Sequence, residues 1–214
     1  MNAEASTLDL ALALIHTRQN VLPKRLVEPG PTGAVLQLIL GAGAAAPDHK
    51  ELQPWRFVIV PQEQRERLAE VFASALLERD SRATPVQVEQ AREKAFRAPF
   101  SMLAIARLSP HGLDRQQDTS HHAHGESSAA DVTDAERLVS LGCAIQNMVL
   151  AAHAAGFGTG LTSGQALRSQ GLRELFSLQA YEHAVCCINL GSVSKNRSSR
   201  VRPAVDDYVS VLRK

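Results

Sequence analysis

The sequence predicts an α+β fold in which helices outnumber strands. Hydrophobic residues make up 44% of the chain but aromatic residues only 4%, so the core must consist mainly of Leu, Val, Ile and Ala, a composition that favours helices. Segments with helical periodicity are long, whereas strand-like segments are few and too irregularly spaced for repeated βαβ units. At 214 residues, the chain fits a single domain spanning residues 1–214.

Several segments carry helical patterns. The longest begins with a capping box, in which Thr133 is the N-cap and Glu136 follows three residues later, and it ends at Gly156. This segment is apolar on nearly all sides, so we expect it to be buried all round, against a partner subunit as well as its own sheet. Helices are expected over residues 7–17, 32 to about 40, 62–78, 86–96, 133–156 and 166–176.

Three apolar segments have the length and composition of buried strands: residues 55–60, 100–108 and 184–190. The glycine-rich stretch 156–164 is predicted to be a loop, and residues 208–212 a final extended stretch. Residues 110–130 turn polar, and we expect a variable, histidine-rich loop there rather than a second domain. Its histidines, His121, His122 and His124, lack a carboxylate-rich partner motif. A solvent-exposed loop is therefore favoured over a metal site, and no bound metal is predicted.

Charge and cysteine content argue against several classes of protein. The net charge of +1 removes the simplest electrostatic case for a nucleic-acid or membrane-surface binder, so we expect neither partner. The cysteines, Cys143, Cys186 and Cys187, form no CxxC pair and are too few for a disulfide framework. Because the sequence shows no secretory signal pattern and no apolar run of about 18 residues, we expect a cytoplasmic protein.

Two basic segments are candidates for holding an anion. Arg18, Gln19 and Asn20 follow the first helix, with two more cations at positions 24 and 25. An arginine followed by short polar groups can bind a phosphate through charge-assisted hydrogen bonds, and a basic residue that complements the helix dipole is the alternative. The second segment includes Lys195 and Arg197 and extends to position 202; its alternative is a solvated surface strip.

Two further segments carry polar or flexible groups. The loop from Pro47 to Trp55 is rich in polar side chains and held by two prolines. Within it, His49 can offer a donor or a proton near neutral pH, and a surface turn that contains a histidine is an equal alternative. The glycines of 156–164 let backbone N–H groups approach a flat ligand closely, although the stretch lacks the GxGxxG spacing of a dinucleotide site. An ordinary glycine-rich turn fits it equally well.

These motifs follow one another in a distinctive order. A helix ends in Arg18-Gln19-Asn20, Pro-Thr-Gly opens the next helix, Ala46-Pro47-Asp48-His49 precedes Gln53-Pro54-Trp55, an Ala-rich helix closes in Gly156-Phe157-Gly158, and Leu190-Gly191 precedes the basic stretch. This order resembles the nitroreductase family of flavoproteins, and within it the compact YdjA-like branch. The resemblance spans almost the whole chain, from Leu10 to Arg202, and Ala-Pro…Gln-Pro-Trp is its most specific part.

The resemblance implies a three-layer sandwich, with a central, mostly antiparallel sheet flanked by helices, assembled as an intertwined homodimer with two FMN sites at the subunit interface. It assigns the ribityl-phosphate end of FMN to Arg18, Gln19 and Asn20, with Lys195 or Arg197 completing the phosphate site. It assigns the lining of the isoalloxazine to Leu161, Thr162 and Ser163. His49 is implied to reach the flavin from the partner chain as a candidate donor, and no side chain need act as a general acid or base.

The implied activity is that of an FMN-dependent oxidoreductase. NADH or NADPH would give a hydride to the flavin, and a small electron acceptor such as a nitroaromatic or a quinone would then receive it, in ping-pong order. The alternatives are a flavin-binding sensor or carrier without turnover, a helical interaction module without a cofactor, and a different enzyme reaction on the same scaffold, such as flavin destruction or dehalogenation. Three departures from the family pattern bear on this choice: Gln19-Asn20 replaces Arg-Ser, Glu51 replaces an asparagine, and Leu161-Thr162 replaces a tryptophan–arginine pair. The acceptor and the choice between NADH and NADPH stay open.

Overall fold

Alternating side chains along a central strand explain why the protein folds in three layers. In strand β3 (Phe100–Arg107), Met102, Ala104 and Ala106 belong to one buried cluster, whereas Leu103 and Ile105 belong to another. Successive side chains of a strand point to opposite faces of the sheet, so β3 presents an apolar surface on both sides. A strand that is apolar on both faces needs a helical layer over each.

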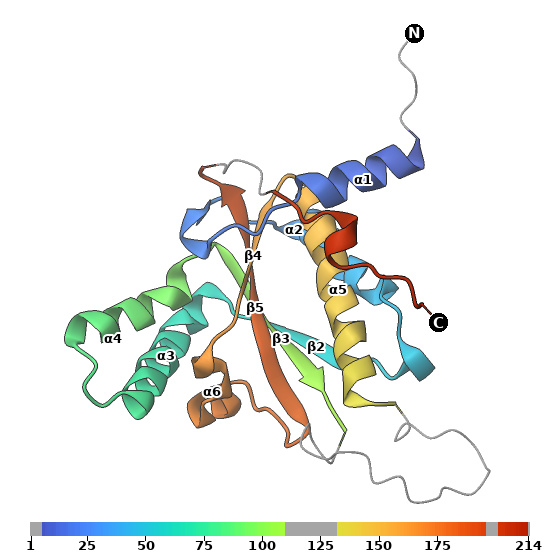
Figure 1. Ribbon diagram of the computed structural model, residues 1–214. Coiled ribbons are helices and arrows are strands. Elements are labelled where there is room, and N and C mark those ends of the chain that lie inside the picture. Colours follow the sequence, from blue (N-terminus) through green and yellow to red (C-terminus); the bar gives the residue numbers. More distant parts are fainter. Residues whose placement is uncertain (1–5, 110–131, 196–200, 214) are drawn as a thin grey trace, which may run out of the picture.

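The computed structural model describes residues 6–109, 132–195 and 201–213, and within them a five-stranded sheet lies between two helical layers (Figure 1). The other strands are β1 (Leu26–Val27), β2 (Trp55–Ile59), β4 (Gly158–Thr162) and β5 (Glu182–Val193). They run in the order β1-β5-β3-β2, with β4 also paired to β5, and each of these pairs is antiparallel. The predicted α+β sandwich with a mostly antiparallel sheet is confirmed.

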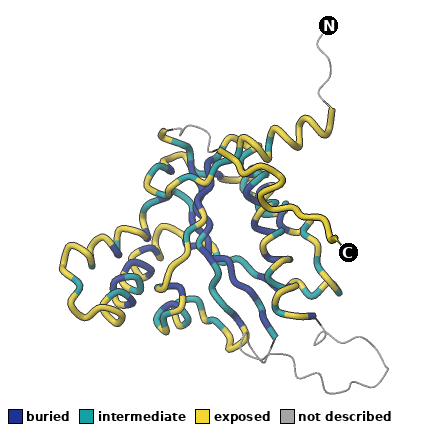
Figure 2. Tube along the Cα trace, viewed as in Figure 1, coloured by how far each residue is buried: buried dark blue, intermediate teal, exposed yellow. Residues whose placement is uncertain are grey.

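Helices from distant parts of the chain form the two outer layers. One face of the sheet is covered by α2 (Gly33–Ala42) and α5 (Asp134–Ala154), which contribute Ile39 and Met148 to the first cluster. The other face is covered by α3 (Arg65–Arg79) and α6 (Gln170–Leu175), through Leu68 and Leu172. Helix α4 (Pro85–Arg92) packs on α3, and α1 (Thr7–Thr17) contacts α5 (Figure 1). Buried residues accordingly follow the strands and the inner faces of the helices (Figure 2).

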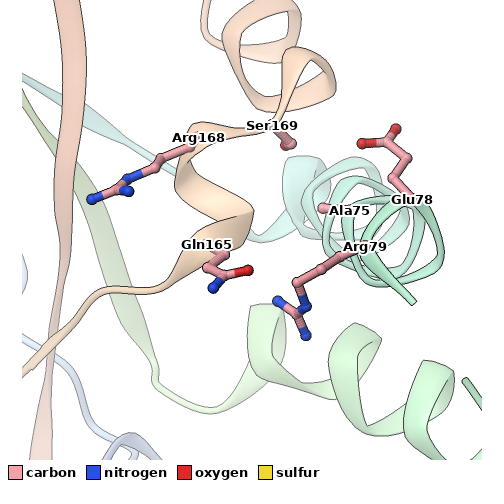
Figure 3. A pocket seen from close by; sticks show the side chains of 6 residues that line it. All are labelled: Ala75, Glu78, Arg79, Gln165, Arg168 and Ser169. Carbon is pink, nitrogen blue, oxygen red and sulfur yellow. The ribbon is translucent and has the colours of Figure 1, made fainter.

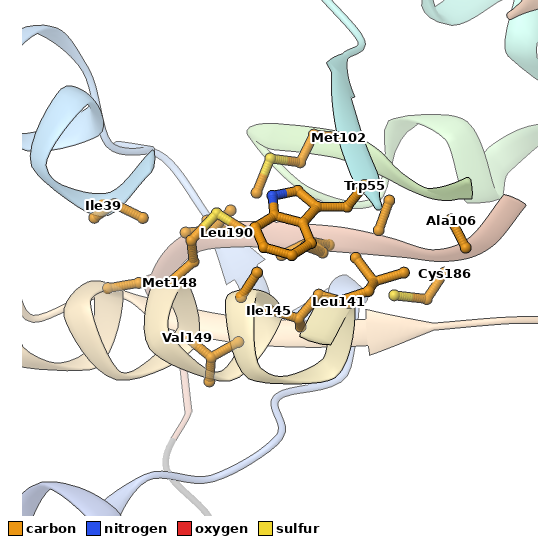
Figure 4. Packing of buried hydrophobic residues seen from close by; sticks show 14 of the residues in the cluster. Ile39, Trp55, Met102, Ala106, Leu141, Ile145, Met148, Val149, Cys186 and Leu190 are labelled. Atoms are coloured by element: carbon orange, nitrogen blue, oxygen red, sulfur yellow. The ribbon is translucent and has the colours of Figure 1, made fainter. Parts of the chain in front are cut away.

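The single tryptophan lies at the centre of the first cluster. Trp55 is the first residue of β2 and is 6% exposed. Its ring lies between Met102 of β3 and the α5 residues Leu141 and Ile145 (Figure 4). A side chain of this size, buried among aliphatic groups, removes a large apolar area from water. Trp55 therefore joins the sheet to α5.

Helix boundaries agree with the capping signals in the sequence. At the start of α5, Thr133 Oγ1 accepts from the Glu136 N–H (3.2 Å) and the Glu136 carboxylate accepts from the Thr133 N–H (2.8 Å), which confirms the predicted capping box. Gly156 follows the helix with a φ of 86°, the left-handed conformation expected of a terminal glycine. The helices predicted over 62–78, 86–96 and 166–176 each combine an α-helix with a 3-10 turn.

One prediction about the region from 133 to 164 is wrong, and a second is not tested by a single chain. Residues 156–164 do not form a loop, because Gly158–Thr162 is strand β4 and pairs with β5. Within the single chain only one face of α5 is buried, since Val139 is 66% exposed, and burial of the opposite face against a partner subunit stays a prediction. The buried residues of α5 recur at helical spacing along one face, at positions 140, 141, 144, 145, 148, 149 and 152. The opposite face of α5 is therefore open in the single chain.

Other predictions concern residues that lie outside the described part of the chain or that form no strand. The histidine-rich loop 110–130 and Arg197 lie outside the described residues. The predicted extended stretch 208–212 forms no strand, and the described residues 201–213 are all exposed around a short 3-10 turn, Val205–Asp207. No described helix is both long and apolar enough to cross a bilayer.

Candidate functional site

The segment that follows α1 is held against β4. The Val21 N–H donates to Thr159 O (2.7 Å). The Leu161 N–H donates to Asn20 Oδ1 (2.9 Å). A Cβ at Gly160 would lie only 2.2 Å from the Val21 carbonyl oxygen, so only glycine allows the two backbones to approach this closely. The glycines of this stretch thus place the residues after α1 beside β4.

This arrangement encloses a cavity of about 490 Å³ between the end of α1, the start of β4 and the end of β5, which we call the arginine cavity. Four residues predicted to bind the phosphate end of a ligand line it together: Arg18, Gln19, Asn20 and Lys195. Arg25 and His153 line it as well. The two basic segments of the sequence therefore meet in one place.

Two arginine nitrogens at this cavity are buried without a partner. Arg18 Nε and Arg25 Nη1 have no hydrogen-bond partner in the part of the chain that the structure describes. No aspartate or glutamate among the described residues lines the cavity. A buried cationic donor that lacks a partner is costly, and a bound anion would satisfy both nitrogens. The chemistry of the arginine cavity fits a phosphate group.

A second cavity, of about 380 Å³, lies between α3 and the sheet, and Leu22 lines both cavities. We call it the apolar cavity, because Leu68, Phe72 and Leu76 of α3 form much of its wall. Thr162 and Ser163, which the sequence analysis assigns to the lining of a flat ring, line this cavity too. The two cavities together provide a charged end and an apolar end.

Polar groups of the apolar cavity come from the strands and from the turn after α4. Asn189 Nδ2 donates to Gly160 O (3.0 Å) and to Thr162 Oγ1 (3.2 Å), which ties β5 to β4 beside the cavity. Burial raises the pKa of the Cys187 thiol, another lining group, to about 12, so this thiol is neutral at physiological pH. Three cations also line the cavity: Arg79, Lys94 and Arg97.

A buried arginine fixes the turn that carries two of these cations. Arg65, at the start of α3, is 2% exposed. Its guanidinium donates to the carbonyl oxygens of Ala95 (3.0 Å), Ala98 (2.5 Å) and Pro99 (3.0 Å). Burial lowers the pKa of Arg65, although a guanidinium stays protonated near neutral pH. These bonds hold the backbone between α4 and β3, and with it one side of the apolar cavity.

A shallow groove adjoins the apolar cavity between the end of α3 and the 3-10 turn Gln165–Arg168. It contains two arginines, but the guanidinium of Arg168 points away from that of Arg79 (Figure 3). Both side chains are exposed, so their charges are solvated and do not converge on one point. This groove lacks the buried, converging donors of the arginine cavity.

A comparison with family models decides which kind of fold this is. The model described as "Nitroreductase family" matches residues 27–192, which is most of the chain and includes β2, β3, β4 and all but the last residue of β5. The chain belongs to the nitroreductase family. The resemblance seen in the order of its motifs is therefore confirmed.

Curated members of the nitroreductase family align over nearly their full length. The chain is 33% identical over 192 residues to YdjA of Escherichia coli (strain K12), which covers 89% of this chain and 92% of that protein. It is 28% identical over 204 residues to a Haemophilus influenzae protein, covering 94% of this chain and 99% of the relative. The names of both assign them provisionally to the NAD(P)H nitroreductases.

Solved structures of the family share the fold at low sequence identity. A nitroreductase-like family protein from Bacillus cereus superposes with a TM-score of 0.75 at 17% identity, covering 99% of this chain and 98% of that one. The FMN-dependent nitroreductase NfnB from Mycobacterium smegmatis, solved in complex with NADPH, gives a TM-score of 0.69 at 14% identity, covering 97% and 100%. These likenesses establish the nitroreductase fold.

In this nitroreductase-family chain, the residues predicted to contact FMN fall into two adjoining cavities and two other places. Arg18, Gln19, Asn20 and Lys195 line the arginine cavity, and Thr162 and Ser163 line the apolar cavity. Leu161 lies in β4 between these groups, is 40% exposed and lines neither cavity. Arg197 lies outside the described residues.

His49 lies apart from both cavities of its own chain. It begins the 3-10 turn His49–Glu51 near the start of α5, and its Nδ1 is 3.1 Å from Glu136 Oε1. Lys50, Glu51 and Gln53 all have positive φ angles, of 62°, 53° and 44°. Such backbone conformations are strained for residues other than glycine and cluster at functional segments. If His49 contacts a ligand in these cavities, that ligand must belong to a second copy of the chain.

The structure adds His153 to the residues predicted for the arginine cavity, and of the two cations at positions 24 and 25 it places Arg25 there. Arg25 is one of several cations after α1, and nothing in the sequence shows which of them turns inward. His153 is in the last turn of α5, where the sequence shows only an alanine-rich helix end. Both reach the cavity because the segment after α1 crosses β4, and that crossing depends on long-range pairing.

Proposed function

We propose that this protein is an FMN-dependent oxidoreductase that uses NADH or NADPH to reduce a small electrophilic acceptor such as a nitroaromatic or a quinone. The observation that carries the proposal is the pair of adjoining cavities. One offers two buried arginine nitrogens without partners, and the other offers apolar walls beside Thr162 and Ser163. A planar cofactor that ends in a phosphate needs this combination of groups.

The residues present fit FMN. Arg18, Arg25 and Lys195 would hold its phosphate through charge-assisted hydrogen bonds. Thr162 and Ser163 would lie beside the isoalloxazine ring in the apolar cavity. Two structural neighbours support the choice of cofactor, since NfnB is described as FMN-dependent with NADPH present and a Desulfitobacterium hafniense nitroreductase is described with bound FMN.

When bound, FMN supplies the redox chemistry, taking a hydride from the nicotinamide and giving it to the acceptor in ping-pong order. The side chains of this protein bind, orient and shield the reacting groups. Leu68, Phe72 and Leu76 exclude water from the apolar cavity. Lys94 and Arg97 line the same cavity and would stabilise negative charge that develops there.

We also propose that the working unit is a homodimer. Helix α1 has no buried residue, and apolar side chains on α1 and α2, including Leu10 and Leu38, are exposed in the single chain. Exposed apolar surface on neighbouring elements marks an interaction site. A second copy would cover it and would bring its own His49 toward the cavities, which His49 does not reach within one chain.

The first test is the visible spectrum of the purified protein after gel filtration, with and without added FMN. We expect flavin absorbance to co-elute with protein at about 46 kDa, twice the 23.1 kDa of one chain. Protein that elutes without flavin after incubation with FMN would overturn the cofactor assignment. It would favour the alternative of an interaction module without a cofactor.

The second test is anaerobic stopped-flow mixing of the FMN-loaded protein with NADH or NADPH. We expect flavin absorbance to bleach with at least one of them and to return when a quinone or a nitroaromatic is added. Tight FMN retention without bleaching by either nucleotide would contradict the reductase assignment. That result would support a flavin-binding sensor or carrier, for which the replacement of a family asparagine by Glu51 gives a reason.

A further inference from the structure

The cations that line the apolar cavity have no partner within the protein. Arg79 is on the last turn of α3, and Lys94 and Arg97 lie in and just after the 3-10 turn Glu93–Phe96. Among the residues that the structure describes, no aspartate or glutamate lines this cavity, and none of the three cations forms a side-chain hydrogen bond or an ion pair. The Glu78 carboxylate points away from the Arg79 guanidinium (Figure 3). The helical wall of the cavity is therefore positively charged.

Acidic side chains of α3 and α4 do not neutralise this wall. Glu70 forms an ion pair with Arg92, as does a glutamate of α4. Glu66 and Glu93 line a separate groove, which Arg97 also borders, and neither forms an ion pair with Arg97 in the described part of the chain. The positive charge of the apolar cavity is thus available to a ligand.

The turn that carries two of these cations is fixed before any ligand binds. The buried Arg65 guanidinium donates to the carbonyl oxygens of Ala95, Ala98 and Pro99. These acceptors lie on both sides of Arg97 in the sequence, so they hold the backbone from which its side chain extends. Charged groups on a fixed backbone lose little further freedom when they bind a ligand, which strengthens the binding.

We propose that the apolar cavity favours an acidic acceptor, an aromatic or quinonoid ring that carries a carboxylate or a sulfonate. The ring would lie against the apolar wall near Thr162 and Ser163, with its acidic group toward Arg79, Lys94 and Arg97. This inference rests on the proposed function and adds a substrate class to it. A neutral acceptor of the same shape would leave these cations without a partner.

The phosphates of NADH and NADPH are a second possible source of negative charge, because in ping-pong order the nucleotide enters the same site. The size of the cavity favours the acceptor. A volume of about 380 Å³ is at the small end of the range for ligand sites. It suits a ring with a short acidic group better than a dinucleotide.

The test is calorimetric titration of the full-length, FMN-loaded, oxidised protein with 4-nitrobenzoate and with its neutral analogue 4-nitrobenzamide. No reductant is present, so only binding is measured. We expect wild type to bind the acid about three- to tenfold more tightly than the amide at low salt, a ratio that several partly exposed cations can produce together. In the double variant Lys94→Gln, Arg97→Gln this ratio should fall below about twofold, and salt at about 0.5 M should lower it in wild type.

Arg67→Gln is the matched control. Arg67 is an exposed arginine of α3 that donates to Gln64 Oε1 (3.0 Å) and does not line the cavity. This variant loses the same charge from the same helix and should keep the wild-type ratio. If the double variant does not fold, Arg79→Gln tests the same wall from the exposed end of α3, and its ratio should also fall.

The outcomes distinguish this inference from the proposed function. Equal affinities of wild type for the two probes, with FMN bound, would overturn the inference alone. Titration with NAD+ and NADP+ tests the other source of charge. A double variant that loses affinity for these nucleotides but keeps the wild-type probe ratio would overturn the inference and assign the cations to the dinucleotide. Protein that takes up no FMN would overturn the inference and the proposed function together.

Discussion

At the scale of single residues, the arginine cavity combines charge with burial. Arg18 and Arg25 each have a buried nitrogen without a partner, and an unsatisfied buried donor costs about 1–3 kcal/mol. Residues that lower stability in this way strengthen the binding of an anion that pairs with them. The resemblance to the family assigns Arg18 and Lys195 to one site, and both line the arginine cavity. The sequence includes Arg25 in the first basic segment but does not show that Arg25 rather than Lys24 lines the cavity, and it does not indicate His153.

Replacing Arg18 tests this view directly. Arg18→Ala should weaken FMN binding by about 1.5–3 kcal/mol, a loss of about 10- to 150-fold in affinity, because it removes a charged hydrogen-bond donor. Fluorescence titration measures the change. Lys24→Ala is the control, because Lys24 is exposed and lines neither cavity. An Arg18→Ala protein that binds FMN as tightly as Lys24→Ala would remove Arg18 from the phosphate site.

At the scale of elements, the sequence predicts the other main strands but not strand β4. The apolar strands β2, β3 and β5 and the capped helices are visible as patterns of residues. The sequence of β4, Gly-Thr-Gly-Leu-Thr, looks like a turn because glycine is rare inside strands. Its glycines are required by contacts with distant segments: a Cβ at Gly158 would lie 2.5 Å from a Val193 methyl group. Because contacts with residues distant in the sequence require these glycines, no local pattern of residues predicts the strand.

Gly160 gives the sharpest test of this element. In Gly160→Ala the new Cβ would overlap the Val21 carbonyl oxygen, a backbone atom that cannot rotate away. We expect the free energy of unfolding to fall by about 1–3 kcal/mol and FMN affinity to fall with it, since Arg18 and Asn20 adjoin this contact. Urea unfolding and flavin titration measure both. Gly171→Ala in α6, whose Cβ would meet Val71 at an ordinary 3.8 Å, should do neither.

The Arg56–Glu182 pair connects the strands on either side of β3. Arg56 Nε and Nη2 donate to the two oxygens of Glu182 at 2.7 and 2.8 Å, and the Glu182 side chain is 4% exposed. The Arg56 guanidinium, more than the Gln179 N–H, lowers the pKa of Glu182 from its usual 4.5 to about 2. Because the folded pKa is depressed, this carboxylate stabilises the fold above about pH 4.5, and the effect is lost as the pH falls toward 2.

This pair predicts part of the acid sensitivity of the protein. The depressed pKa corresponds to about 3 kcal/mol. When the pH falls from about 7 to about 2, the free energy of unfolding of the wild type should therefore fall by about 3 kcal/mol more than that of Glu182→Gln. Urea unfolding across this range measures it. Glu174→Gln, which changes an exposed carboxylate bonded to Gln170, should follow the wild-type profile. Parallel curves for wild type and Glu182→Gln would show that the pair has no such effect.

At the scale of the whole molecule, the two faces of the sandwich differ in what they leave exposed. Most of the exposed large apolar side chains lie on α1, α2, α5 and the C-terminal segment, whereas fewer, Leu77, Val86 and Phe96, are exposed on the other helical layer. Leu38 on α2 is 74% exposed. The proposed homodimer would bury this side of the molecule and add His49 of the second copy to the site.

A charged substitution on this side should separate the subunits. Leu38→Glu should shift the gel-filtration peak from about 46 kDa toward the 23.1 kDa of one chain, since burying an unpaired carboxylate is costly. FMN affinity should fall in parallel if the partner completes the site. Val86→Glu is the matched control, because Val86 is 65% exposed but lies on α4, on the other side of the sheet. If Leu38→Glu elutes at the same volume as Val86→Glu, Leu38 is not part of the subunit interface.

The strand with the most neighbours is also the last to be synthesised. β5 pairs with β1, β3 and β4, so of the strand pairs only β2–β3 forms without it. A chain emerging from the ribosome before residue 182 can assemble that hairpin with α3 and α4, but β4 then has no neighbouring strand to hold it beside the residues after α1. Since nascent domains fold from the N-terminus as residues appear, this protein must wait for its C-terminal part. The arginine cavity, which needs β4 in place and is lined by residues at the end of β5, can therefore form only after β5 has been synthesised.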